Sequence, residues 1–185
     1  VMLMQLSVYG FIDYNTSTEL VRVKQRLYDF FLARVGKIDY DVINFRSTVQ
    51  APTDNGVLNL ENFDFTINGV EQIFLSDSQN VQIRPRNQQI ILQKNRDFRF
   101  DGTVKAGLFT YRGKDFKFNY DKFKIDLDSI ESLSMDVIVD ERKGYNDPLL
   151  AKVNSTMENL AGEVLIDAPD NKSGVENYPE YPVFK

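Results

Sequence analysis

The fold is decided by two stretches of alternating sequence, Asp97-Phe-Arg-Phe-Asp-Gly-Thr-Val-Lys-Ala-Gly107 and Phe116-Lys-Phe-Asn-Tyr-Asp-Lys-Phe-Lys-Ile-Asp-Leu127. In both, apolar side chains alternate with charged or polar ones, which is the period of a β-strand with one buried and one wet face. The same alternation recurs in segments between Lys37 and Asp140. All-parallel sheets are buried on both faces and lack it. The sequence therefore predicts a mainly β fold.

Gly102 interrupts the first stretch without changing its phase. A hairpin at Asp101-Gly102 would place Val104 on the wrong side of the sheet. A continuous strand instead keeps one face apolar across the glycine, with Phe98, Phe100, Val104, Ala106 and Leu108 in phase. We therefore expect one strand with a glycine bend or bulge here.

The connectivity of the strands is less constrained. Asn68-Gly69 favours a two-residue hairpin that places Ile67 opposite Val70. Short strands joined by Asn, Asp and Gly corners also suit an irregular β-solenoid, although no fixed repeat period is present. The alternative architecture is a curved, largely antiparallel sheet.

Two helices are predicted to flank the sheet. The first, near residues 17–35, begins at the capping-box pattern Thr16–Glu19 and ends before Gly36. The second, near residues 148–161, begins at Asp147-Pro148 and ends at Gly162. Each carries an apolar stripe that we expect to pack on the sheet of its own domain. The stripes are Leu20, Val23, Leu27, Phe30, Phe31 and Val35, and Leu150, Val153, Met157 and Leu160.

These elements predict a single β-rich domain over residues 1–168, followed by an extended tail over residues 169–185. The steps Tyr178-Pro179 and Tyr181-Pro182 exclude helix from the tail. Because the chain opens on Val1 and closes on apolar Val183 and Phe184, we interpret it as a piece of a longer protein, with the tail starting a following segment.

The composition excludes several classes of function. The 185 residues include neither Cys nor His, which removes disulfides, thiol chemistry, Cys/His metal sites and His-dependent catalysis. No apolar run approaches the roughly 18 residues of a membrane-spanning helix. Because 27 acidic residues outnumber 22 Lys and Arg, nucleic acid is not an expected partner. The short basic stretches Arg22–Arg26 and Arg84–Arg86 are interpreted as solvated surface.

Few residue patterns suggest chemistry. Asp126 with Asp128, and Asp39 with Asp41, have the same-face spacing of a glycosidase pair, although solvated strands produce it constantly. The loop Asp167–Gly174 offers oxygen ligands for calcium but contains Lys172 and lacks EF-hand spacing. No nucleophile or phosphate-binding motif is present. We therefore assign no catalytic, cofactor-binding or metal-binding residue, expect no cofactor, and leave ligand-binding residues unknown.

The segments Asn62–Gly69, Asp97–Gly107, Phe116–Leu127 and Asn171–Pro182 resemble interior parts of long, uncharacterised Gram-negative cell-envelope proteins. The resemblance implies an exported chain, periplasmic or associated with the outer membrane, with no known activity. The alternating, β-rich sequence pattern also resembles that of the lipid-conducting AsmA-like proteins. Asp128-Ser129-Ile130 resembles an O-glycosylation acceptor of some Gram-negative secreted proteins.

The expected function is a non-catalytic structural or interaction module of a large exported envelope protein. Its partner would be the rest of the parent chain or another envelope protein. One alternative is a lipid-handling module, in which the aromatic side chains of the strands line an apolar groove. Another is a glycan-binding or glycan-hydrolysing module. A filled interior favours the first reading, a dry open groove the second, and a Tyr-lined cleft with inward acids the third.

Overall fold

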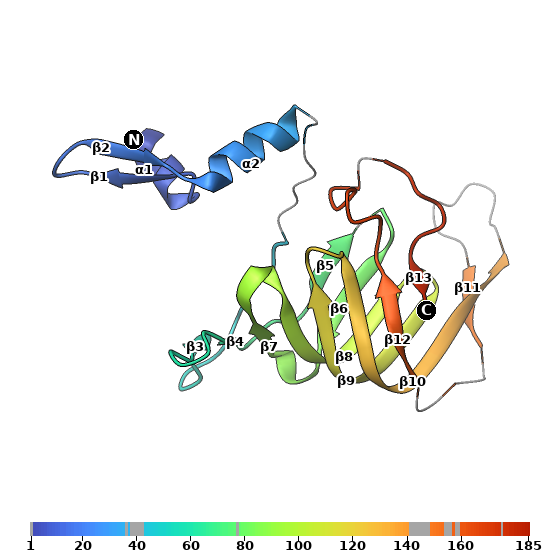
Figure 1. Cartoon of the computed structure of the whole chain (residues 1–185). Helices are drawn as coiled ribbons and strands as arrows, with labels where there is room; N and C mark the ends of the chain where they lie inside the picture. The colour runs from blue at the N-terminus through green and yellow to red at the C-terminus, as the bar shows by residue number, and fades with distance from the viewer. Residues whose placement is uncertain are drawn as a thin grey trace. The chain divides into compact units, whose positions relative to one another are not determined.

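The computed structural model describes residues 2–35, 37, 43–76, 78–140, 149–153, 157, 160–174 and 176–185. The chain forms two compact units, Val1–Val42 and Ile43–Lys185, in place of the single domain predicted over residues 1–168. The first unit contains α1 (Met2–Val8), β1 (Ile12–Asn15), β2 (Leu20–Val23) and α2 (Gln25–Arg34) (Figure 1).

The predicted helix over residues 17–35 is wrong in its first part, where the chain forms the β1–β2 hairpin. The side-chain Oδ1 of Asn15 accepts hydrogen bonds from the backbone N–H groups of Ser17 and Thr18. Glu19 adopts a positive φ of 56° in the same turn. The apparent capping box is therefore the tip of a hairpin, because the Asn side chain organises the turn and the valines of β2 favour a strand.

The first unit leaves most of its apolar side chains exposed. Among its described residues, Ile12 is the only buried apolar side chain, and α2 buries none. Leu27, expected at the centre of a packed stripe, is only half-buried. The exposed large apolar side chains of this unit are Met2, Leu3, Met4, Val8, Tyr9, Leu20, Val21, Val23, Tyr28, Phe30, Phe31 and Val35.

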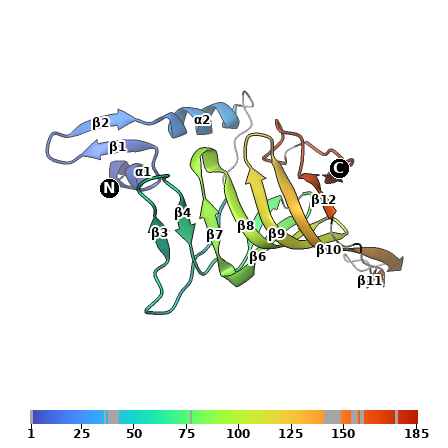
Figure 2. The ribbon, with the colours of Figure 1, turned by 60° about the horizontal axis from the view of Figure 1, so that its bottom comes forward.

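The second unit is a curved antiparallel sheet (Figures 1 and 2), as predicted for one of the two architectures. Its strands run in the order β13-β12-β10-β9-β8-β7-β4-β3, while β6 also pairs with β8, β5 with β6, and β11 with β10. They are β3 (Gly56–Leu58), β4 (Phe65–Ile67), β5 (Ile73–Ser76), β6 (Val81–Pro85), β7 (Ile90–Leu92), β8 (Phe98–Ala106), β9 (Phe109–Asn119), β10 (Lys124–Asp140), β11 (Leu149–Lys152), β12 (Leu160–Leu165) and β13 (Val183–Phe184), with short 3₁₀ turns η1 (Arg86–Gln88) and η2 (Lys94–Arg96).

Strand β8 is continuous across Gly102, which confirms the prediction of a bend without a hairpin. The strand changes partner at this point. Phe98 and Arg99 pair with β7, whereas Gly102 to Ala106 pair with β6. Gly102 has a φ of 151°, and a Cβ there would lie 2.3 Å from the carbonyl oxygen of Arg84. Glycine thus lets two strands share one edge of β8.

The predicted helix near residues 148–161 is wrong in its described part, while Asp147 and Pro148 lie outside the described residues. Strands β11 and β12 both pair antiparallel with β10, and Met157 forms a bridge to Leu133 between them. The long edge of β10 needs hydrogen-bond partners, and this pairing overrides the local helical spacing. Gly162 lies within β12, where a Cβ would be 2.4 Å from the carbonyl oxygen of Lys185.

The predicted hairpin at Asn68-Gly69 is also wrong. Ile67 pairs with Gly56 of β3 and Ile90 of β7, not with Val70. A Cβ on Gly69 would lie 2.2 Å from the carbonyl oxygen of Thr48. The glycine is required for this close approach of two chain segments.

One face of the sheet forms the core. Its aromatic side chains pack in pairs, with the ring centroids of Phe98 and Phe118 4.9 Å apart. The predicted tail belongs to this unit, because β13 pairs with β12 and the Phe184 ring lies 5.1 Å from that of Tyr111. The core residues are Ile67, Val70, Ile73, Leu75, Val81, Ile83, Ile90, Phe98, Phe100, Val104, Ala106, Tyr111, Phe116, Phe118, Tyr120, Phe123, Ile125, Leu127, Ile130, Leu133, Val164 and Ile166.

Candidate functional site

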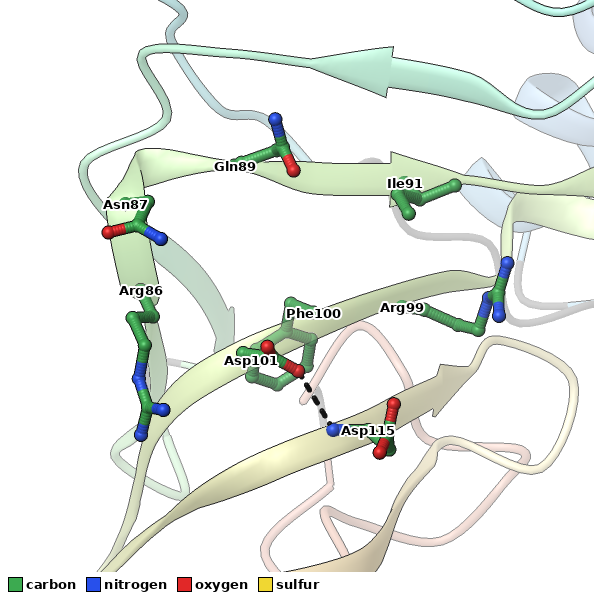
Figure 3. A pocket seen from close by; sticks show the side chains of 8 residues that line it. All are labelled: Arg86, Asn87, Gln89, Ile91, Arg99, Phe100, Asp101 and Asp115. Carbon is green, nitrogen blue, oxygen red and sulfur yellow. Dashed lines mark hydrogen bonds between the residues drawn. The ribbon is translucent and has the colours of Figure 1, made fainter.

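A cavity of about 240 Å³ lies at the fork where β8 changes partner from β7 to β6 (Figure 3). Strand β7 pairs with β8 only near Ile91 and Leu92, so the start of β7 and the η1 turn diverge from β8. The lining residues are Arg86, Asn87, Gln89, Ile91, Arg99, Phe100, Asp101 and Asp115. The cavity is therefore a consequence of the branched sheet.

The cations of this cavity are paired with acids outside it. A guanidinium N–H of Arg86 donates to Glu131 at 2.8 Å, and Lys114 lies 3.3 Å from the same carboxylate. Hydrogen bonding from Arg86 and then from Lys114 holds the pKa of Glu131 below its ordinary value. Arg99 pairs with Asp64 at 3.3 Å. Both arginines are thus neutralised by the protein itself.

The carboxylate of Asp101 is also committed to structure, whereas Asp115 contributes its backbone N–H. Oδ1 of Asp101 accepts a hydrogen bond from the backbone N–H of Asp115 at 2.9 Å, the dashed line in Figure 3. Asp115 has a positive φ of 55°, so this bond stabilises an unusual backbone conformation. The pair links β8 to β9 and does not present two free carboxylates to a substrate.

Asp126 and Asp128, which have the spacing of a glycosidase pair, differ in their surroundings. Asp126 accepts a hydrogen bond from Lys124 at 2.6 Å, and Lys124 also donates to Glu163 of β12 at 2.6 Å. These bonds raise the pKa of Lys124, Asp126 contributing first, and Lys124 lowers the pKa of Glu163. Asp128 is exposed beside an irregularity in the β10 ladder. Asp39 and Asp41, which have the same spacing, lie outside the described residues.

The loop Asp167–Gly174, to which no calcium site is assigned from the sequence, is organised around a buried carboxylate. Asp167 is 1% exposed and accepts hydrogen bonds from the backbone N–H of Ala168 and from the side-chain amides of Gln79 and Asn171, at 2.7, 3.2 and 3.1 Å. Since these N–H groups point at its oxygens, the site presents positive hydrogen atoms where a cation would need lone pairs. Within the described residues, no three acidic side chains converge as metal ligands do.

The remaining sequence candidates lie apart from one another. In the first basic stretch, Lys24 pairs with Asp13 at 3.1 Å and Arg26 lies over the ring of Phe11. In the O-glycosylation-like tripeptide, Ser129 is exposed while Ile130 is buried in the core. The second basic stretch is divided, because Arg86 pairs with Glu131 whereas Arg84 points outward from β6.

The structure also assembles a group of residues that the sequence analysis did not single out. Polar side chains on the outer face of β6, β8, β9 and β10 lie in register across the sheet, among them Arg84, Lys105 and Arg112. In the sequence they are scattered at alternate positions of separate strands. The only local signal was that alternation, which is common to every half-exposed strand.

Comparison of the chain with protein-family models, with curated proteins and with solved structures finds no match. In the part of the chain that the structure describes, neither helix has the length and apolar character needed to cross a bilayer.

Proposed function

We propose that the chain is a non-catalytic structural or interaction module of a large exported bacterial envelope protein, located in the periplasm or at the outer membrane. The observation that carries the proposal is the interior of the β unit, which its own side chains fill. Phe116, Phe118 and Phe123 are completely buried, with the Phe116 ring packed against Phe100 and the Phe118 ring against Phe123. A close-packed interior of this kind stabilises a fold, which supports a structural role.

A lipid-handling module and a glycan hydrolase receive less support. A lipid-handling module needs a continuous apolar groove, whereas the cavity at the β6–β7–β8 fork is lined mainly by charged and amide side chains. A glycan hydrolase needs an acid and a base facing one substrate. The carboxylates of Asp101, Asp126 and Asp167 instead accept hydrogen bonds from neighbouring parts of the protein.

Two features favour an interaction role. The first unit exposes Met2, Val8, Leu20 and Phe31 by more than 60% of their surface. In the second unit, β3 is the last strand of the sheet order, and its Val57 and Leu58 are at least half exposed. Exposed apolar side chains and an unpaired strand edge are typical of contact surfaces. The partner proposed for them is the rest of the parent chain or another envelope protein.

Native mass spectrometry of the purified chain, combined with a glycan and ester hydrolysis panel, tests this function. We expect a mass equal to that of the polypeptide alone and no turnover of any substrate. A stoichiometric co-purified lipid would support the lipid-handling alternative. Hydrolysis of a glycan, absent from a heat-denatured control, would support the hydrolase.

A further inference from the structure

Two rows of side chains cross the outer face of the sheet on β6, β8, β9 and β10. In one row, Gln82 pairs with Lys105, Lys105 with Thr110, and Thr110 with Ser134. Directly paired residues of antiparallel strands project from the same face. We call both rows together the cationic face; it consists of Gln82, Lys105, Thr110 and Ser134 in the first row and Arg84, Thr103, Arg112 and Ser132 in the second.

The cationic face contains three positive charges and no acid, in a protein whose formal net charge is -5. Within the described residues, neither Arg84, Lys105 nor Arg112 forms an ion pair, although neighbouring Arg86, Lys114 and Lys124 all do. Along the strands, Asp101 and Glu131 come next on one side of the rows and Asp136 on the other. Glu131 is itself paired with Arg86 and Lys114. The two rows themselves therefore carry no acid and, within the described part of the chain, three unpaired cations.

The spacing of the face suits an extended ligand with repeated negative charges. Neighbouring strands lie about 4.8 Å apart, so the backbones of Arg84 and Arg112, separated by β8, are about 10 Å apart. Each guanidinium can form two parallel hydrogen bonds to one carboxylate or sulfate group. The hydroxyls of Thr103 and Ser132 and the amide of Gln82 can bond to hydroxyl groups lying along the same rows.

An exposed aromatic ring extends the first row by one strand. Phe74 of β5 pairs directly with Gln82 and is 57% exposed. A flat ring beside amide and hydroxyl groups can pack against the apolar face of a sugar, while those groups bond to its edge. The ring adds a contact that a purely electrostatic surface does not need.

We propose that the cationic face and Phe74 bind an acidic polysaccharide, one that carries carboxylate or sulfate groups along its chain. The proposal rests on the interaction role proposed above, because it names a partner for it. An acidic peptide fits less well, since the backbone groups of β8 and β9 are used in the sheet and only side chains reach a ligand on this face. Nucleic acid also fits less well. Binding to it is driven largely by counterions released when Lys and Arg neutralise phosphates, and this face has only three cations on an acidic protein.

Calorimetric titration of the whole chain with alginate, with heparin and with neutral dextran tests the proposal. We expect binding of at least one acidic polysaccharide, loss of that binding in 0.5 M NaCl, and no binding of dextran. The variant R84Q/R112Q should weaken binding by about tenfold or more, because it removes two charge-assisted contacts. Phe74→Ala should weaken it by a smaller factor without changing its salt dependence.

The matched control is R22Q/R34Q, which removes the same charge from two exposed arginines of the first unit. All variants should melt at the temperature of the unmodified chain, since each changed side chain is exposed. Equal weakening by R22Q/R34Q, or no binding of either acidic polysaccharide, would overturn the proposal. So would tighter binding of poly-glutamate or of anionic phospholipid vesicles. Cleavage of a polysaccharide during the titration would instead overturn the non-catalytic role.

Discussion

Gly102 has a backbone conformation and a close neighbour that together exclude any other residue. Its φ of 151° is one that L-amino acids rarely adopt, and a Cβ would meet the backbone of Arg84 at 2.3 Å. We expect Gly102→Ala to lower the free energy of unfolding by about 2–4 kcal/mol, because both strain and a backbone clash must be relieved. Urea unfolding measures the change.

The control for this prediction is Gly107→Ala. Gly107 also has a positive φ, of 58°, but a Cβ there would meet only the Pro182 ring at 3.6 Å. Its cost should be about 1 kcal/mol, the conformational part alone. Equal effects of the two substitutions would show that the close approach to Arg84 is unimportant.

The buried phenol of Tyr111 makes the stability of the core depend on pH in the alkaline range. Burial raises the pKa of its phenol to about 12. Because the folded protein holds this proton more tightly than the unfolded chain, the stabilisation is complete below pH about 10 and is lost as the pH rises through 12. Tyr111→Phe should therefore reduce the loss of stability between pH 9 and pH 12 by roughly 2 kcal/mol.

Urea unfolding at several pH values checks this prediction, with Tyr28→Phe as the control at an exposed tyrosine. If Tyr111→Phe lost as much free energy of unfolding between pH 9 and pH 12 as the unmodified chain, ionisation of the phenol would not be what destabilises the protein.

At the level of elements, Asp167 connects the segment after β12 to the turn between β5 and β6. Its carboxylate accepts N–H groups from Gln79 and Asn171, and Asn171 also bonds to the backbone of Glu176. In Asp167→Asn, an amide N–H would face these donors, so we expect a loss of about 2 kcal/mol. Faster amide exchange around Glu176 and Tyr178 should accompany it.

Asp170→Asn is the control, because Asp170 is exposed in the same segment. Equal loss of stability in the two variants would contradict the account of a buried polar anchor.

The elements also show which parts of the fold are local properties of the sequence. The strand across Gly102 could be predicted because alternation of period two is visible within one segment. Strands β11 and β12 could not, since the apolar residues of this region have helical spacing and only pairing with β10 makes these segments strands. The β1–β2 hairpin was not predicted, because the spacing of Thr16 and Glu19 also matches the capping-box pattern of a helix start.

The cationic face was missed for a related reason. Arg84, Lys105 and Arg112 are separated by more than 20 residues from first to last, with acids between them in the sequence. Their grouping depends on cross-strand register, which no single strand encodes. The Asp pairs with glycosidase spacing are close in sequence, but Asp126 is bonded to Lys124, and Asp39 and Asp41 lie outside the described residues.

At the level of the whole molecule, the proposed function depends on the role of the aromatic side chains on the core face of the sheet. If the aromatic side chains are core, they contribute to stability in the absence of any ligand. If they line a groove for acyl chains, their removal changes binding and has little effect on the empty protein. Phe118 is suited to separate these cases, because it is completely buried and contacts the rings of Phe98 and Phe123.

The most direct measurement is the free energy of urea unfolding of Phe118→Ala, beside that of Phe74→Ala at an exposed ring. The account predicts a loss of about 3–5 kcal/mol for Phe118→Ala, from lost burial and the cavity left behind, and less than about 1 kcal/mol for Phe74→Ala. A loss for Phe118→Ala as small as that for Phe74→Ala would contradict a filled core.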